Sequence, residues 1–116
     1  MVDAERLICA ARDLEDGGRG VRFELQWGTK PLAAFAIRSK GKVYAYLNNC
    51  PHQGTELDWQ EGEFFDESTL YLMCATHGAA FFTDTGYCCG GPCRGRSLVK
   101  VAVEEHDEHI YWLEPT

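Results

Sequence analysis

Long apolar runs, helix signals and basic charge are all scarce in this 116-residue sequence. No apolar run approaches the roughly 20 residues that cross a bilayer, and no signal-peptide core follows the charged N-terminal residues. We therefore expect a cytoplasmic protein that does not span a membrane. Lysine and arginine total 11 against 18 acidic residues, for a formal net charge of −7. Because nucleic-acid phosphates require a basic surface, this charge argues against a nucleic-acid partner.

The sequence also lacks internal repeats, low-complexity tracts and linkers. Its length is that of one ordinary domain, so residues 1–116 are interpreted as a single domain. Helix signals at residues 58–61 and 68–69 support at most a turn or two. Alternating apolar and polar residues instead predict short strands separated by turns. The predicted strands are 7–11, 21–27, 32–37, 43–47, 98–103 and 109–113.

Two predicted hairpins frame a different central region. Residues 39–42 form a turn between the third and fourth predicted strands, and a charged turn at 104–108 joins the last two. Residues 48–96 are rich in Gly, Cys, His and Asn, with one apolar stretch at 69–73. The sequence thus predicts an all-β domain, a small antiparallel sandwich or partly open barrel, with an inserted irregular segment that carries the binding residues.

Five of the six cysteines lie between positions 50 and 93. Without a secretion signal, this clustering favours metal binding over a disulfide framework. The sixth, Cys9, falls in an apolar strand and is expected to be a small core residue. Cys88, Cys89 and Cys93 exceed the needs of one metal site, so packing is the first interpretation, with a redox or alternative-ligand role as the second.

Two short motifs each pair a cysteine with a histidine. They are Cys50-Pro51-His52 and Cys74-Ala75-Thr76-His77, and 21 residues separate His52 from Cys74. Zinc accepts such a set, but the common zinc patterns pair Cys with Cys and His with His. A [2Fe–2S] cluster explains the mixing, because one iron takes both cysteines and the other takes both histidines. A structural zinc module stays open as an alternative at this point.

The two motifs, with Gly78 after the second and Gly91-Pro92 downstream, resemble the Rieske iron–sulfur family. The resemblance implies an antiparallel β fold with an inserted cluster-binding subdomain, at about residues 48–96. It implies that Cys50, His52, Cys74 and His77 hold one [2Fe–2S] cluster, with the histidines as the route for electrons. Residues 86–92 match the family's third loop, which covers the cluster. The gap between the motifs is a few residues longer than in most such ferredoxins.

Residues beside the motifs resemble the low-potential branch of the family. High-potential members carry a disulfide at the positions of Thr55 and Thr76, which excludes that bridge here. They also donate hydrogen bonds to sulfur from a Ser and a Tyr where this chain has Ala79 and Phe81. Such hydrogen bonds stabilise the reduced cluster and raise its potential. We therefore expect a potential near the lower Rieske limit, roughly −150 mV.

These features imply an electron-transfer protein without catalytic activity of its own. Its implied partners are a flavin-dependent ferredoxin reductase and a terminal oxygenase, as in ring-hydroxylating dioxygenase systems, or another redox enzyme. The alternative is a small Rieske subunit of a larger reductase such as a nitrite reductase. His106-Asp107-x-His109 is interpreted as a solvated hairpin turn, since three such neighbouring residues converge poorly on one metal.

Overall fold

The computed structural model describes residues 7–27, 30–49, 57–58, 62–66, 68–74, 78–91 and 95–113. Ten strands and one short 3-10 helix, η2 (Ala11–Asp13), lie within these ranges. The strands are β1 (Leu7–Ala10), β2 (Val21–Trp27), β3 (Lys30–Ser39), β4 (Lys42–Leu47), β5 (Tyr71–Met73), β6 (Ala80–Phe82), β7 (Cys88–Gly90), β8 (Lys100–Val101), β9 (Val103–His106) and β10 (His109–Trp112). The expected all-β class is therefore confirmed.

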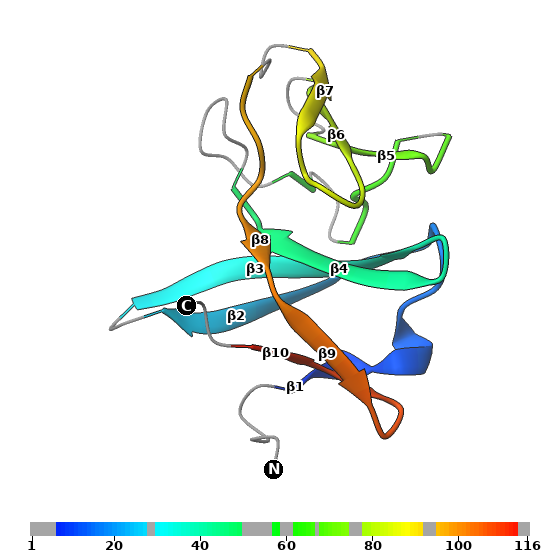
Figure 1. The fold of residues 1–116 in the computed structure, drawn as a ribbon, viewed down its shortest axis with the longest axis vertical. Coiled ribbons are helices and arrows are strands. Elements are labelled where there is room, and N and C mark those ends of the chain that lie inside the picture. Colours follow the sequence, from blue (N-terminus) through cyan, green and yellow to red (C-terminus); the bar gives the residue numbers. More distant parts are fainter. Residues whose placement is uncertain are drawn as a thin grey trace.

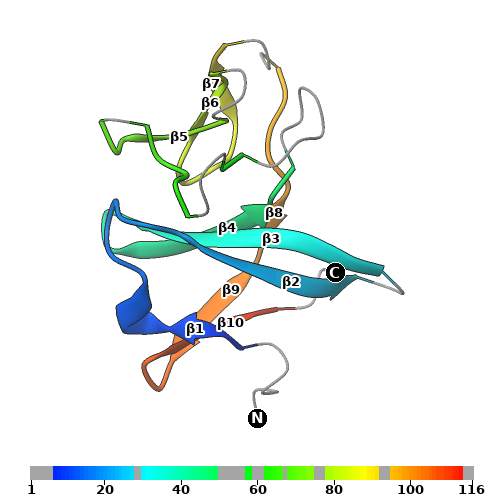
Figure 2. The same ribbon diagram turned by 180° about the vertical axis from the view of Figure 1, so that it is seen from behind.

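The strands form three antiparallel sheets stacked in three layers (Figure 1). The central sheet has the order β2-β3-β4-β8. The sheet β1-β10-β9 lies on one side of it and the sheet β5-β6-β7 on the other, an arrangement that is also plain from behind (Figure 2). The third sheet belongs to the segment in which the sequence placed the binding residues, and we call it the upper sheet.

Burial on both faces of the central sheet explains the continuous apolar run in β3. Successive side chains of a strand point to opposite faces. Phe35 and Ile37 accordingly join the core beneath the upper sheet, whereas Ala34 and Ala36 join the core shared with the β1-β10-β9 sheet, which we call the lower core. The upper core is built largely from aromatic and aliphatic side chains, and the Phe35 and Phe64 rings stack in it with centroids 4.0 Å apart. The central sheet thus anchors the upper sheet to the rest of the protein.

The turn predicted at residues 39–42 is confirmed. Lys40 and Gly41 both have positive φ, 52° and 81°, as a tight two-residue hairpin turn requires. The Asp16 carboxylate accepts hydrogen bonds from both of their backbone N–H groups, at 2.9 and 2.6 Å. Local turn chemistry and one distant carboxylate together fix this hairpin.

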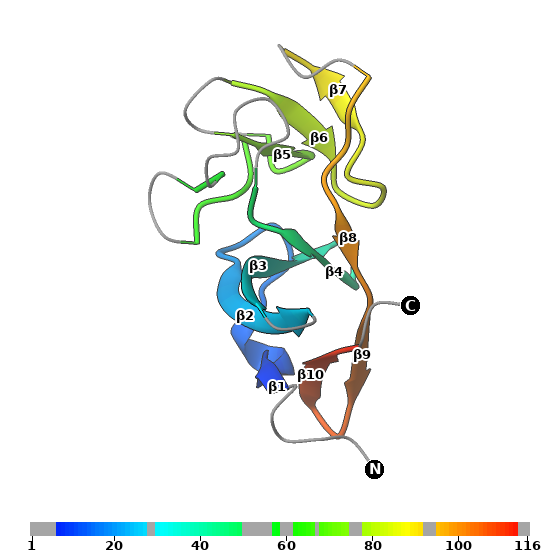
Figure 3. The ribbon, with the colours of Figure 1, turned by 90° about the vertical axis from the view of Figure 1, so that its left-hand side faces the viewer.

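The second predicted hairpin needs correction. The expected strand 98–103 is divided between two sheets, because β8 pairs with β4 and β9 pairs with β10. The turn is Asp107-Glu108, shorter than the predicted 104–108. Figure 3 shows this part of the chain descending from the upper sheet past β4 to the β1-β10-β9 sheet. Alternation of apolar and polar residues predicts a strand but does not show with which sheet the strand pairs.

Helix is nearly absent from the described residues, as expected. Within the described ranges the one short helix lies at Ala11–Asp13. Asp58 and residues 68–69, where the sequence suggested a helical turn, are not helical, and residues 59–61 lie outside the described ranges. Within the ranges the structure describes, no helix has the length and apolar character to cross a membrane.

Candidate metal centre

Of the four predicted ligands, Cys74 lies within the described residues, whereas Cys50, His52 and His77 lie outside them. Cys74 directly follows β5, is 0% exposed and is a free cysteine. Among the described residues no group of three or more His, Cys, Asp or Glu side chains is gathered to hold a metal ion. The described part of the candidate centre is therefore its framework together with one thiol.

The loop that begins at Cys74 is closed by two backbone hydrogen bonds. Cys74 N–H donates to the Ala79 carbonyl and Gly78 N–H donates to the Cys74 carbonyl, each at 2.8 Å. The chain turns back at Gly78, where φ is +72°, a conformation that favours glycine. The β5–β6 hairpin thus holds the second ligand motif at one end, with its cysteine facing the upper core.

The predicted third loop packs directly against this second loop. A β-carbon at Gly91 would lie 2.9 Å from the Ala79 α-carbon and 3.1 Å from the Gly78 carbonyl oxygen. At the start of the same loop, a β-carbon at Gly86 would lie 2.7 Å from the Tyr46 ring. Only glycine permits these approaches, so Gly91 places the third loop beside the second and Gly86 places its start against Tyr46 on β4.

The first ligand loop leaves β4 and returns to a buried carboxylate. Asn48, just after β4, accepts a hydrogen bond from Leu57 N–H through its side-chain oxygen at 2.8 Å. Its amide nitrogen donates to the Asp58 carboxylate at 3.1 Å. Arg22 on β2 donates to both oxygens of that carboxylate, at 2.7 and 2.9 Å. Residues 48 and 57, which flank the first ligand motif, therefore meet at one polar cluster.

The Asp58 side chain is fully buried, whereas that of Arg22 is 34% exposed. Burial by itself would raise the pKa of Asp58, but hydrogen bonds from Arg22, Asn48 and the Gly62 N–H outweigh it and hold the pKa below its usual value. Asp58 is consequently ionised at neutral pH. No pattern in the sequence indicated Arg22, Asn48 or Asp58 as part of the site. The available signal was weak: an Arg at an alternating polar position of a strand, and an Asp beside an apolar residue in a loop.

The positions that separate high- from low-potential members are partly described. Ala79 and Phe81 are both fully buried in the upper core. Thr55 and Thr76 lie outside the described residues. Ala79 and Phe81 carry no hydroxyl, so neither side chain donates a hydrogen bond toward the candidate centre.

The additional cysteines differ from one another. Cys9 is half-buried and packs against the lower core, as predicted. Cys89 is exposed and free, so it is not a packing residue. Cys88 is buried and disulfide-bonded, which corrects the interpretation of it as an ordinary packing residue. The number and spacing of cysteines do not show which of them pair, because a disulfide depends on which sulfur atoms the fold brings together. Cys93 lies outside the described residues.

His106, Asp107 and His109 lie at the β9–β10 turn, as expected. His106 stacks on Tyr111 with ring centroids 4.8 Å apart, and a ring nitrogen of His109 is 2.8 Å from the Asp107 carbonyl oxygen. The His106 and Asp107 side chains approach to 3.5 Å. The two imidazoles thus make separate contacts, and no group of three metal-binding side chains is gathered at this turn, which lies wholly within the described ranges.

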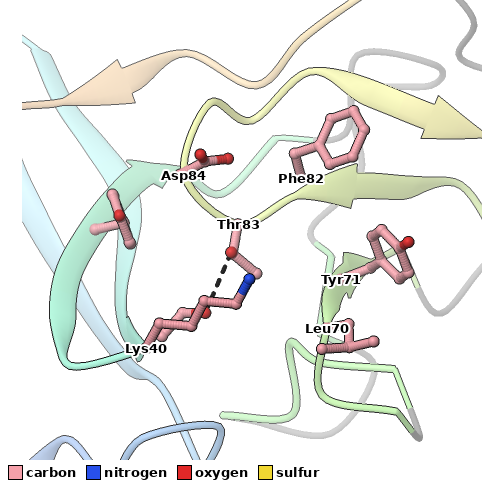
Figure 4. A pocket seen from close by; sticks show the side chains of 8 residues that line it. Lys40, Leu70, Tyr71, Phe82, Thr83 and Asp84 are labelled. Atoms are coloured by element: carbon pink, nitrogen blue, oxygen red, sulfur yellow. Dashed lines mark hydrogen bonds between the residues drawn. The ribbon is translucent and has the colours of Figure 1, made fainter.

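A surface pocket opens at the other end of the β5–β6 hairpin from Cys74 (Figure 4). Its walls come from the β3–β4 hairpin and the upper sheet: Ser39, Lys40, Tyr44, Leu70, Tyr71, Phe82, Thr83 and Asp84. The Ser39 and Thr83 hydroxyls are hydrogen-bonded at 3.2 Å, and the Tyr46 hydroxyl donates to the Thr83 carbonyl at 2.8 Å. The pocket contains none of the predicted ligands and marks the seam that joins the central and upper sheets.

Fold and site together define a small β protein with a buried cysteine, Cys74, at the start of a loop against which a second loop packs closely through a glycine. Residues 5–106 match the family described as "Rieske [2Fe-2S] domain". The chain belongs to the Rieske [2Fe–2S] domain family, and the predicted family and [2Fe–2S] cofactor are confirmed. No curated protein sequence matches the chain.

Several solved structures share this fold. One chain of the complex of reduced oxygenase and oxidized ferredoxin in carbazole 1,9a-dioxygenase is 26% identical, with a TM-score of 0.70, and the match covers 92% of this chain and 99% of that one. The Sphingomonas yanoikuyae B1 ferredoxin is 22% identical, with a TM-score of 0.71 and coverages of 94% and 97%. The ferredoxin of carbazole 1,9a-dioxygenase from Nocardioides aromaticivorans IC177 is 20% identical, with a TM-score of 0.71 and coverages of 94% and 96%.

Larger proteins contain the same fold as a part. The terminal oxygenase of carbazole 1,9a-dioxygenase from Novosphingobium sp. KA1 has a TM-score of 0.77 at 18% identity. The match covers 92% of this chain and only 28% of the oxygenase. This chain therefore corresponds in extent to the ferredoxins and to one part of the oxygenase.

Proposed function

We propose that this protein is a one-electron carrier that accepts electrons from a flavin-dependent ferredoxin reductase and passes them to a terminal oxygenase. One observation carries the proposal: the fold matches 99% of a chain in an oxygenase–ferredoxin complex, at 26% identity. The ferredoxins it resembles are electron carriers and not enzymes. Because the ferredoxins are matched over nearly their whole length, we assign this chain the role of a carrier and no catalytic activity of its own.

We propose Cys50, His52, Cys74 and His77 as the ligands of the cluster. The two thiolates and two imidazoles are the donor set that a Rieske [2Fe–2S] cluster takes, and the bound cluster supplies one-electron chemistry. The described framework fits this assignment, because Cys74 is free and shielded from solvent. Shielding of this kind lowers the local dielectric constant, which strengthens the influence of neighbouring hydrogen bonds on the potential.

The experiment that tests this function is an absorption and low-temperature EPR spectrum of anaerobically purified protein, before and after dithionite. A red-brown protein with a rhombic Rieske signal after reduction is the expected result. His77→Ser removes the signal, whereas His109→Ser, on the exposed β9–β10 hairpin, keeps it. A colourless protein that contains zinc would contradict the proposal and favour the structural zinc module.

Transfer itself is tested with a flavin-dependent ferredoxin reductase and a ring-hydroxylating terminal oxygenase. We expect the reductase to reduce the protein and the reduced protein to be reoxidised by the oxygenase. A protein that carries the cluster but exchanges electrons with neither enzyme would overturn the proposed partners and leave the cofactor assignment intact. The cytoplasmic location, the single domain over residues 1–116 and the cluster-binding subdomain at about 48–96 stay predictions.

A further inference from the structure

Asp58 has a fully buried carboxylate that accepts four hydrogen bonds. Its side-chain oxygens accept hydrogen bonds from Arg22, from the Asn48 amide and from Gly62 N–H at 3.0 Å. Arg22 also reaches the Asp58 carbonyl oxygen at 3.3 Å. A buried charge is costly unless it is paired and hydrogen-bonded, and the two-pronged Arg22 contact is among the strongest such pairings. The fold therefore satisfies this carboxylate unusually completely.

The donors to Asp58 come from separate parts of the chain. Arg22 is on β2, 36 positions away in sequence, and Asn48 follows β4. Asn48 is itself tied to β3, since its backbone N–H donates to the Ala33 carbonyl at 2.9 Å. Gly62 is tied back as well, because its carbonyl accepts from Gly20 N–H at 2.8 Å. Asp58 is thus hydrogen-bonded to three segments of the chain, each of which is itself attached to the central sheet or to the chain beside it.

The same cluster closes the chain around the first ligand motif. Asn48 accepts from Leu57 N–H with its oxygen and donates to Asp58 with its nitrogen. Because the motif with Cys50 and His52 lies between Asn48 and Leu57, both chain ends that enter it are fixed. By contrast, the second motif is closed by backbone hydrogen bonds between Cys74, Gly78 and Ala79. The first loop depends on side chains for its closure.

We infer that Asp58 is the positioning residue of the first ligand loop, acting with Arg22 and Asn48 to hold the chain ends that present Cys50 and His52. This inference rests on the proposed function. Side chains that orient metal ligands from outside affect metal retention more than their contribution to stability alone would suggest.

The test compares Asp58→Asn with a core variant of equal stability. Asp58→Asn keeps the size of the side chain and removes its charge. The matched control is Ile110→Val or Ile110→Ala, whichever has the same unfolding temperature, because Ile110 is fully buried in the lower core away from the ligand loops. Cluster loss is followed by visible absorption well below the unfolding temperature, and the reduced clusters are compared by EPR.

We expect Asp58→Asn to lose its cluster about ten-fold or more faster than the Ile110 control, and to show a broadened or shifted Rieske signal. Equal rates and identical EPR signals in the two variants would overturn the inference, because the carboxylate would then contribute only to general stability. If Asp58→Asn does not fold, the same comparison is made with Arg22→Lys, which keeps a positive charge beside the buried carboxylate and loses the contact to both of its oxygens. A wild-type protein without a Rieske signal would instead defeat the proposed function itself, and with it the inference.

Discussion

Gly91 lies against the backbone of Ala79, so closely that a β-carbon at position 91 would be 2.9 Å from the Ala79 α-carbon. The contact joins the third loop to the loop that starts at Cys74. Gly91 also has a φ of +86°, which disfavours any other residue. Two separate physical reasons therefore require glycine at this position, one steric and one conformational.

Gly91→Ala should separate these two loops and destabilise the protein. Gly95→Ala is the matched control, since Gly95 has a φ of +85° but a β-carbon there would meet no atom within 4 Å. The control carries only the cost of the left-handed conformation, about 1–2 kcal/mol. Gly91→Ala should cost about 1–3 kcal/mol more, as overpacking does. Urea unfolding measures both values, and equal costs would show that the loop contact is unimportant.

Asp58 should make the stability of the protein sensitive to acid. Its pKa is lowered in the folded state, so its contribution is fully present above the pKa of an unfolded aspartate, about 3.9, and is lost as the pH falls through the folded value. Asp58→Asn should flatten this loss in thermal unfolding measured from neutral pH down to about pH 3. Asp107→Asn is the control, because the Asp107 side chain is 92% exposed. An unchanged acid profile in Asp58→Asn would contradict the assignment.

Of the free cysteines in the described ranges, Cys89 should be alkylated first. It is exposed, whereas Cys74 is fully buried. Burial, with a smaller contribution from Asp13, raises the pKa of Cys9 to about 11. Burial also raises the pKa of the Cys89 thiol, so the greater exposure of Cys89 decides the order. Because the thiolate is the reactive form, Cys9 should react more slowly than Cys89 near neutral pH, and both should react faster as the pH rises.

Iodoacetamide labelling followed by peptide mass spectrometry checks this order. Cys89→Ser should remove the rapid phase and leave the Cys9 phase unchanged. The peptide with Cys88 should become labelled at that residue only after a reductant is added, because Cys88 is disulfide-bonded. Labelling of Cys9 as fast as Cys89 would show that the strand β1 is not packed as described.

Ala79→Ser combined with Phe81→Tyr should raise the reduction potential from its expected low value of roughly −150 mV. The two hydroxyls are introduced at buried positions of the upper core, and hydrogen bonds toward sulfur favour the reduced cluster. The matched control is Ala80→Ser with Phe82→Tyr, one residue further along, where Phe82 is 42% exposed. Redox titration followed by EPR should show a rise for the first pair alone. Equal potentials would defeat the hydrogen-bond argument.

Local patterns predicted the features that depend on neighbouring residues. The alternation in β2 correctly places Phe23 and Leu25 in the lower core, while the polar Arg22 and Glu24 lie on the opposite face of the strand. The turn after Ser39 follows from a Lys-Gly pair that adopts positive φ. In each case the signal and the structure lie within a few residues of one another, so the sequence contains the required information.

Long-range pairing was harder to predict. The strands β6 and β7 are three residues each, too short to produce a periodic pattern among the glycines and cysteines around them. The chain from Leu98 onward changes sheets, with Leu98 in the upper core and Val101 in the lower one. Partner choice depends on which edges are free after the rest has folded, and that is not a property of the segment itself.

By itself the sequence determined the all-β class, the family and the chemical identity of the four candidate ligands, because these follow from residue type and short spacing. The tertiary structure alone decided how the ligand loops are supported. Arg22 meets Asp58 across 36 positions, and Gly91 meets Ala79 across loops on different strands. Such contacts depend on the stacking of the upper sheet on the central one. Only after the whole chain has folded is the Asp58 charge buried and is the Gly91 backbone brought against that of Ala79.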